Sequence, residues 1–502
     1  CGGGRRRRVG GRRIRRGFRG RQRLHLLDGR GRRCRPPAGG LRPAGDGVAP
    51  QPPPLRPPHR RDAAVRGGSG GGCGGGGRGR RGGHPRSARV GGGQGVSGKI
   101  PPSDRTSSVS GETRSLATRC TSLRPVSLLL YIVTSNVYVI QLYSRKTGGE
   151  GGSRKVHVSF LDGGGHRVTE GMAAARAVSE GVRLAARLVD TPPGELTPAA
   201  YSEECRRLAG ELGDCVTFSE IVGDELRERG YGGLFGIGKA ATSPPRLVVM
   251  EYVPPGADGT MEHVALVGKG ITYDTGGLSL KPKAGMPGMK RDMGGSAGVL
   301  GGFYAAVTLG TPKRITLILC LAENAIGPAA VRNDDILTMY SGKTVEINNS
   351  DAEGRVVLGD GVAHATRHIP HLDLVVDMAT LTGAQLVCTG KKHAGILANT
   401  AELEGRAMDA GLYSGDLCFP MLYCPEHLNQ EFHSEVADMK NSVKDRNNAQ
   451  SSCAGHFIER HLDENYKGGW LHVDMAGPGD RDERGTGYGV GLVASLLAAP
   501  GF

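Results

Sequence analysis

From about residue 165 onward, short apolar runs bounded by glycine alternate with longer stretches of helical apolar periodicity. This alternation constrains the fold most, because strands that alternate with helices form a sheet covered on both faces. Thr197 and Pro198 mark one helix start, with threonine as N-cap and proline in the first turn. The sequence therefore predicts an α/β fold with three layers, in which helices flank a mixed, largely parallel sheet. The expected strands are residues 247–252, 264–267, 315–321, 344–347 and 372–378, and the expected helices are residues 170–189, 296–309, 354–368 and 453–462.

The first part of the chain has a different composition. Residues 1–100 hold 26 basic and 3 acidic residues, whereas the remaining residues hold 39 basic and 46 acidic ones. Residues 1–110 are rich in arginine, glycine and proline and show no apolar period, so we predict that they are disordered. An RNA-binding tail is one interpretation, since clustered arginines bind phosphate; translated non-coding sequence is the interpretation that we favour. We expect residues 111–165 to be a remnant or misassigned region, so that the N-terminal third is disordered or irregular, and residues 166–502 to form the catalytic domain.

Three further features bear on the compartment and on the origin of the chain. Residues 126–143 form an apolar run that is shorter and more polar than most membrane-spanning helices, which need about 20 apolar residues, so we expect no membrane span. The 11 cysteines form no CxxC pair, which favours a reducing, cytoplasmic location. The first methionine is Met172, which suggests a fragment or a wrongly assembled gene.

Charged residues gather in two glycine-rich segments that follow expected strands. In residues 267–295, Asp274 precedes a pair of glycines and Asp292 precedes another, with Lys269 and Lys281 nearby. In residues 348–360, three charged residues stand at alternate positions: Asp351, Glu353 and Arg355. Open α/β sheets place their sites in the loops at strand ends, so we expect these side chains to converge.

The residue types favour a metal site. Four carboxylates on flexible loops suit a pair of divalent cations, which would neutralise charges that otherwise repel. Neither segment contains histidine, and such an oxygen-rich set fits Zn, Mn or Mg. Taken singly, each aspartate is more often a turn or cap residue, but the two segments together favour the metal site.

These segments resemble the signature motifs of the M17 leucine aminopeptidase family. VGKGITYDTGG and NNSDAEGR are similar to its two signatures, RLVDTPPGELTP to its domain entry and DMATLTGA to its substrate loop. The resemblance covers roughly the last 320 residues, and smaller details resemble the probable aminopeptidase-like branch of animals. Ser350 stands where the family usually has threonine, which keeps the hydroxyl. The separate N-terminal α/β domain of the family has no counterpart in the pattern of residues 1–165.

The resemblance implies a set of metal ligands. Asp274, Asp351 and Glu353 would hold one cation, and Lys269, Asp274, Asp292 and Glu353 would hold the other. Lys269 would bind as a neutral amine, which requires a lowered pKa. A hydroxide that bridges the two metals would be the nucleophile.

The resemblance also implies the groups that act on the substrate. Lys281 would stabilise the oxyanion, and Arg355 would hold bicarbonate as a proton shuttle. Lys281 follows Asp274 by seven residues, beyond the turn of Gly276 and Gly277, so we expect it to face the substrate carbonyl and not the metals. Met289, Thr380 and Leu381 would line the pocket for the first side chain, while Asp292 would bind the free amine. The family further implies a homo-oligomer, a hexamer, acting on peptides with a free N-terminus.

The sequence thus predicts a metal-dependent aminopeptidase that releases N-terminal amino acids. The alternative is a catalytically silent protein that binds metal, or RNA through its Arg/Gly-rich tail. A phosphate-binding protein built on the glycine-rich loops lacks a complete phosphate-loop motif. Lys281 and Arg355 favour catalysis, because neither is needed merely to fold. We expect no nucleic-acid partner.

Overall fold

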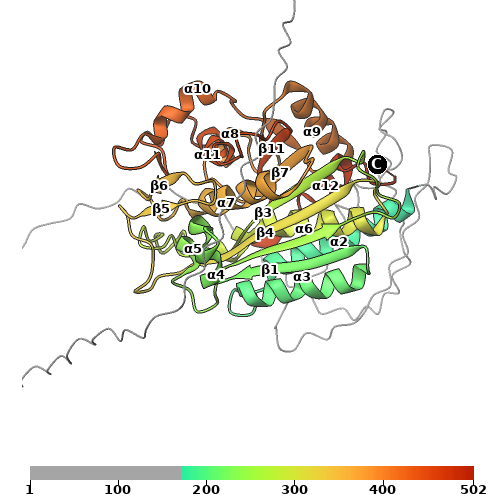
Figure 1. Cartoon of the computed structure of the whole chain (residues 1–502), viewed down its shortest axis with the longest axis horizontal. Coiled ribbons are helices and arrows are strands. Elements are labelled where there is room, and N and C mark those ends of the chain that lie inside the picture. Colours follow the sequence, from blue (N-terminus) through green and yellow to red (C-terminus); the bar gives the residue numbers. More distant parts are fainter. Residues whose placement is uncertain (1–170, 502) are drawn as a thin grey trace, which may run out of the picture. The chain divides into compact units, whose positions relative to one another are not determined.

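The computed structural model describes residues 171–501, and all structural statements concern this part of the chain (Figure 1). Its centre is an eight-stranded sheet with the order β1-β2-β4-β3-β7-β11-β8-β9. The strands are β1 Val216–Val222, β2 Arg246–Tyr252, β3 His263–Asp274, β4 Arg314–Asn324, β7 Leu374–Ala379, β8 Ala394–Ala398, β9 Cys418–Pro420 and β11 Gly469–Asp474.

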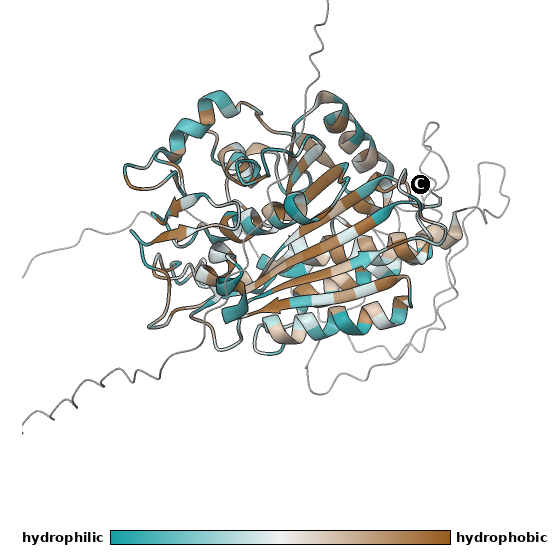
Figure 2. Cartoon of the chain, viewed as in Figure 1, coloured by the Kyte–Doolittle hydropathy of each residue, from teal (hydrophilic) through white to brown (hydrophobic). Residues whose placement is uncertain are grey.

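The four middle strands of the sheet are parallel, and an antiparallel pairing flanks them on each side. β4, β3, β7 and β11 run parallel to one another, while β2 and β8 pair antiparallel to the outer two of them. Parallel strands with both faces covered have continuous apolar runs, and Figure 2 shows the central strands mostly in the hydrophobic colour. The predicted mixed, largely parallel sheet is confirmed.

Helices cover both faces of the sheet. Along β2, Val248 and Met250 belong to one hydrophobic core, whereas Leu247 and Val249 belong to the other, as the alternation of side chains requires. One core is covered by α2 Met172–Asp190, α3 Pro198–Leu212, α6 Gly294–Thr308, α9 Ala401–Ser414 and α12 Val490–Leu496. The other is covered by α4 Asp224–Glu228, α5 Gly232–Gly238, α7 Glu353–His368, α10 Pro425–Leu428 and α11 Gln450–Glu459. The three-layer prediction is therefore confirmed.

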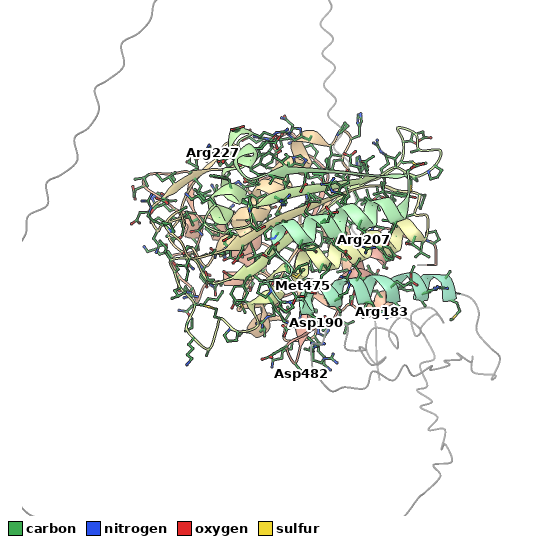
Figure 3. The ribbon with its side chains drawn as sticks, turned by 90° about the horizontal axis from the view of Figure 1, so that it is seen from below. Arg183, Asp190, Arg207, Arg227, Met475 and Asp482 are labelled. Atoms are coloured by element: carbon green, nitrogen blue, oxygen red, sulfur yellow. The ribbon has the colours of Figure 1, made fainter. Side chains whose placement is uncertain are left out.

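The helix start that the sequence predicted is present. Thr197 is the N-cap of α3, its hydroxyl accepts a hydrogen bond from the Ala200 amide at 3.3 Å, and Pro198 occupies the first turn. Beside α3 lies α2, whose last residue, Asp190, is buried and is labelled in Figure 3. The Gly485 amide donates to Asp190 Oδ1 at 2.9 Å, so the end of α2 is tied to the hairpin of β12 Asp480–Arg481 and β13 Arg484–Gly485.

One strand lies in a different sheet from the one we expected. β6 Thr344–Glu346 does form, but it pairs with β5 Ile336–Thr338 and β10 Met439–Lys440 in a separate three-stranded sheet. The loop that follows β6 therefore reaches the site from beside the main sheet and not from its edge.

Several predictions fall on residues outside the described part. These are the disorder of residues 1–110, the apolar run at 126–143, and the domain limits at 110 and 165, all of which stay predictions. Within residues 171–501, no helix is both long enough and apolar enough to span a membrane.

Candidate metal centre and cavity

A cavity of about 470 Å³ opens beside the carboxyl ends of β3 and β7. This edge is where parallel strands of an open sheet place their ligands. All ten residues that the sequence singled out line the cavity: Lys269, Asp274, Lys281, Met289, Asp292, Asp351, Glu353, Arg355, Thr380 and Leu381. The structure thus brings together two motifs and a third loop that are separated along the chain.

Asp274 is the last residue of β3 and is fixed by its neighbours. Its Oδ1 accepts hydrogen bonds from the Gly276 amide and from Asn324 Nδ2, both at 2.9 Å. Gly276 and Gly277 have φ values of 84° and 59°, a left-handed backbone that favours glycine, and this turn folds the chain back beside the carboxylate. The sequence analysis missed Asn324, although it ends β4, the parallel neighbour of β3.

The two motif loops are joined through Ser350. Its hydroxyl donates to the Gly276 carbonyl at 2.8 Å and accepts from the Ser279 amide at 2.7 Å. The serine that replaces the usual threonine therefore supplies the hydroxyl that this junction uses. As a result, one carboxylate oxygen from each of Asp274, Asp351 and Glu353 lies within 4.8 Å of the other two.

Lys269 lies in the middle of β3 and is almost completely buried. Its Nζ lies 2.8 Å from Asp292 Oδ1 and 3.0 Å from Glu353 Oε1, and it donates to the Thr380 carbonyl at 3.2 Å. The hydroxyl of Thr380 also donates to Asp292 Oδ1, at 3.0 Å. Asp292 belongs to the short helix η1 Met289–Met293, which Lys290 anchors by donating to the carbonyl of Asp190 at 2.7 Å.

Lys281 contacts two of the carboxylates that are expected to hold a metal. Its Nζ lies 2.7 Å from Asp274 Oδ2 and 2.6 Å from Asp351 Oδ1. The reason is electrostatic, because an ammonium group is drawn to the point where carboxylates converge. Lys281 is partly exposed to the cavity, in contrast to Lys269.

Burial and mutual repulsion raise the pKa values of two of these acids. Burial, together with the charge of Asp274, raises the pKa of Glu353 to about 8. Burial also raises the pKa of Asp292 to about 6. For Lys269, burial lowers the pKa, but the surrounding carboxylates outweigh it and the net shift is upward. A neutral amine ligand requires a lowered pKa, and this arrangement does not lower the pKa of Lys269. Cation charge beside the amine would be needed to lower it.

The donor set fits divalent cations. Asp292 Oδ2 and Glu353 Oε2 are buried and have no hydrogen-bond partner among the described residues. A buried carboxylate oxygen without a partner is costly, and a cation would satisfy it. Carboxylates with one amine and no histidine match the oxygen-rich site that we predicted for Zn, Mn or Mg.

Arg355 lies in the first turn of α7 and is 4% exposed. Its Nε and Nη1 have no hydrogen-bond partner within residues 171–501, and burial lowers the pKa of its guanidinium to about 10. Two unpartnered donors on a buried cation that lines the cavity fit a small anion.

The wall also contains residues that the sequence analysis did not assign. Arg291, Leu386, Ser442, Arg446 and Gln450 line the cavity. The last three come from the segment between β10 and α11 and from the first turn of α11. Ser442 ends the segment 436–442 and Gln450 directly precedes the segment 451–455, and neither segment has a spacing that pointed to a cavity wall.

The loop that holds Thr380 and Leu381 is fixed by a buried acid from β11. Asp474 Oδ1 accepts from the Leu381 amide at 3.1 Å, and Asp474 Oδ2 accepts from the Thr382 hydroxyl at 2.7 Å. Because β11 was not among the expected strands, Asp474 was missed as well.

Comparison with known proteins gives one family. Residues 183–494 match the model of the cytosol aminopeptidase family, catalytic domain. The human protein named "Probable aminopeptidase NPEPL1" is 53% identical over 319 residues, which are 64% of this chain and 60% of that protein. The chain thus spans about 60% of the length of this curated relative.

Solved structures agree with this. The leucine aminopeptidase of Caenorhabditis elegans has a TM-score of 0.67 and 40% identity, with 74% of each chain covered. The bottromycin maturation enzyme BotP, whose structure is a complex with Mn, has a TM-score of 0.61 and 35% identity, over 66% of this chain and 72% of that one. The family match, these likenesses and the cavity lined by the two signature motifs lead to one conclusion: the chain belongs to the M17 cytosol aminopeptidase family.

Proposed function

We propose that this chain is a metal-dependent aminopeptidase that releases N-terminal amino acids from peptides. The observation that carries the proposal is the convergence of Lys269, Asp274, Asp292, Asp351 and Glu353 on one cavity. Lys281 and Arg355 line the same cavity, and neither is needed only to bind a metal. The family membership implies peptide substrates.

The ligands divide into two sets that share residues. Asp274, Asp351 and Glu353 would hold one cation, and Lys269 and Asp292 would join Asp274 and Glu353 in holding the other. When bound, Zn, Mn or Mg would lower the pKa of a water molecule and polarise the peptide carbonyl.

The protein side chains position the substrate. Asp292 accepts the free α-amine, which restricts cleavage to the first residue of the peptide. Lys281 donates to the oxygen that gains charge as the carbonyl is attacked. Arg355 would hold a bicarbonate ion, which would supply a proton shuttle at this place. Met289, together with the loop of Thr380 and Leu381, contacts the first side chain.

The direct test is hydrolysis of a panel of aminoacyl amides by the full chain. After treatment with a chelator the protein should be inactive, and adding Zn or Mn should restore turnover. A protein that binds two cations per chain but hydrolyses no member of the panel would instead support a catalytically silent binding protein. RNA binding through residues 1–110 is the other outcome that we would follow in that case.

Metal affinity should rise with pH. The pKa values of Asp292 and Glu353 are raised to about 6 and about 8, so both carboxyls are protonated in mild acid and must lose protons before they bind cations. Affinity should therefore be low below pH 6, increase as Asp292 ionises, and increase again as Glu353 does. Calorimetric titration of the chelator-treated protein with Mn, in two buffers of different ionisation enthalpy, measures both affinity and proton release. A constant affinity without proton release would contradict this expectation.

Assembly and location also belong to the proposal. We propose a homo-oligomer, a hexamer, on family resemblance alone, and light scattering at micromolar concentration tests it, with a monomer as the refuting result. The family's name supports a cytoplasmic location.

A further inference from the structure

One basic side chain at the cavity has no role in the proposed chemistry. Arg446 lines the cavity together with Gln450, and it is exposed. It belongs to the loop of residues 444–449, between β10 and α11. The question is what a guanidinium at this place could bind.

The loop that carries Arg446 is held in place on both sides of it. Before it, the Lys444 amide donates to the Glu431 carbonyl at 3.2 Å and the Asp445 amide donates to Glu431 Oε2 at 3.1 Å. After it, Asn448 Nδ2 donates to Glu431 Oε1 at 2.8 Å. Ala449 then adopts φ 41° and ψ 47°, a left-handed conformation that is rare for a residue with a Cβ. Glu431 thus acts as a clamp that fixes the backbone of this loop beside the cavity.

The charge of Arg446 is not compensated by the described protein. Arg291, which also lines the cavity, forms an ion pair with Asp480 at 3.2 Å. Within residues 171–501, by contrast, no ion pair or side-chain hydrogen bond involves Arg446. Its guanidinium is therefore available to an acidic group that enters the cavity.

The position of the loop indicates which part of a peptide it meets. Asn441 Oδ1 accepts from the amide of Asn349, and the Ser442 amide donates to Asn348 Oδ1, both within 3.2 Å, so this segment is joined to the motif that carries Asp351. The residues expected to contact the first side chain are joined to Asp292 through Thr380. Arg446 follows the segment that is joined to the motif of Asp351, and on this ground we assign it to the side of the leaving group.

We propose that Arg446 selects peptides that carry a carboxylate directly after the scissile bond. The carboxylate is either the C-terminus of a dipeptide or the side chain of an acidic second residue. The inference rests on the proposed aminopeptidase function and names a preferred substrate class for the same site. Arg446 acts on substrate binding, and Glu431 is the positioning residue that holds its loop.

The experiment compares matched substrates with the full chain and added Mn. Leu-Glu-amide against Leu-Gln-amide reports the acidic second residue, and Leu-Gly against Leu-Gly-amide reports the free C-terminus. We expect kcat/KM to be about fivefold higher for the acidic member of at least one pair. This is the effect that one partly exposed ion pair typically has on binding, so the difference should appear in KM and not in kcat. The preference should shrink at high salt, since screening weakens exposed charges.

Two substitutions of Arg446 and one control connect the preference to this residue. Arg446→Gln should bring the ratio close to one, and Arg446→Lys should retain part of it. The control is Arg227→Gln on α4, an exposed arginine that does not line the cavity (Figure 3), and it should keep the wild-type ratio.

Three results would overturn the inference. They are equal rates on both pairs in the wild type, a ratio unchanged by Arg446→Gln, and a preference that appears only with Glu-Leu-amide against Gln-Leu-amide. The last would place Arg446 on the side of the first residue. In all three cases the neutral peptides are still hydrolysed, whereas failure of the proposed function would abolish turnover of every substrate.

Discussion

Replacing Asp274 by asparagine should remove metal binding and turnover together. Asp274 is buried at the end of β3, and its oxygens lie within 4.8 Å of ligand atoms of Asp351 and Glu353. It is also the residue expected in both cation sites. Asparagine keeps the shape but loses the charge that binds cations. Affinity should fall by more than about a hundredfold, because loss of outer-shell partners alone costs 10–100-fold.

Two measurements check this prediction, and only one of them depends on activity. Metal content per chain should drop after dialysis against micromolar Mn. Mn that binds the folded wild-type chain should raise its melting temperature. At a Mn concentration of a thousand times Kd the added stability is about 4 kcal/mol, and in the variant this rise should largely disappear. The matched control is Glu323→Gln, a half-buried acid on β4 next to Asn324 that does not line the cavity. If Asp274→Asn keeps both cations, the assignment of the ligands is wrong.

Replacing Lys281 by alanine should lower turnover while metal content stays nearly unchanged. Removing one donor to an oxyanion typically costs about 3–4 kcal/mol, or roughly a hundred- to thousandfold in rate. Lys281 contacts Asp274 and Asp351 here, so its loss removes a competing cation from those carboxylates and should not weaken metal binding. Lys283→Ala, an exposed neighbour on the same loop, is the control and should retain activity.

Lys269→Ala should behave differently from Lys281→Ala. Its amine is buried against Asp292 and Glu353, and we expect it to become a ligand of one cation. The variant should therefore lose occupancy of one site as well as rate. If Lys281→Ala loses metal and Lys269→Ala keeps it, the two roles are reversed. If neither variant affects turnover of an active parent, the site lies elsewhere.

The local sequence was sufficient to locate a strand or a helix wherever one structural signal was strong. Apolar runs located β2, β4 and β7, and the capping threonine located the start of α3. β11 was missed because its side chains do not read as an apolar run. Trp470 and His472 alternate with apolar residues. Trp470 Nε1 donates to Asp377 Oδ2 of the neighbouring β7 at 2.8 Å, and His472 Nδ1 lies 2.5 Å from Asp377 Oδ1. These contacts satisfy the polar atoms and allow both side chains to be buried. A polar residue that is satisfied by a distant partner cannot be recognised as a core residue from its own segment.

The sequence by itself pointed to the family, to the α/β class and to ten of the residues that line the cavity, through residue types at short spacing and through the resemblance of its motifs. The tertiary structure alone decided which of those residues touch. It placed Lys281 on Asp274 and Asp351, moved β6 into a separate sheet, and brought Arg446 to the cavity wall. Each of these outcomes depends on contacts between segments far apart in the chain. Charge attraction, burial and hydrogen bonding act through space, so spacing along the sequence does not encode them directly.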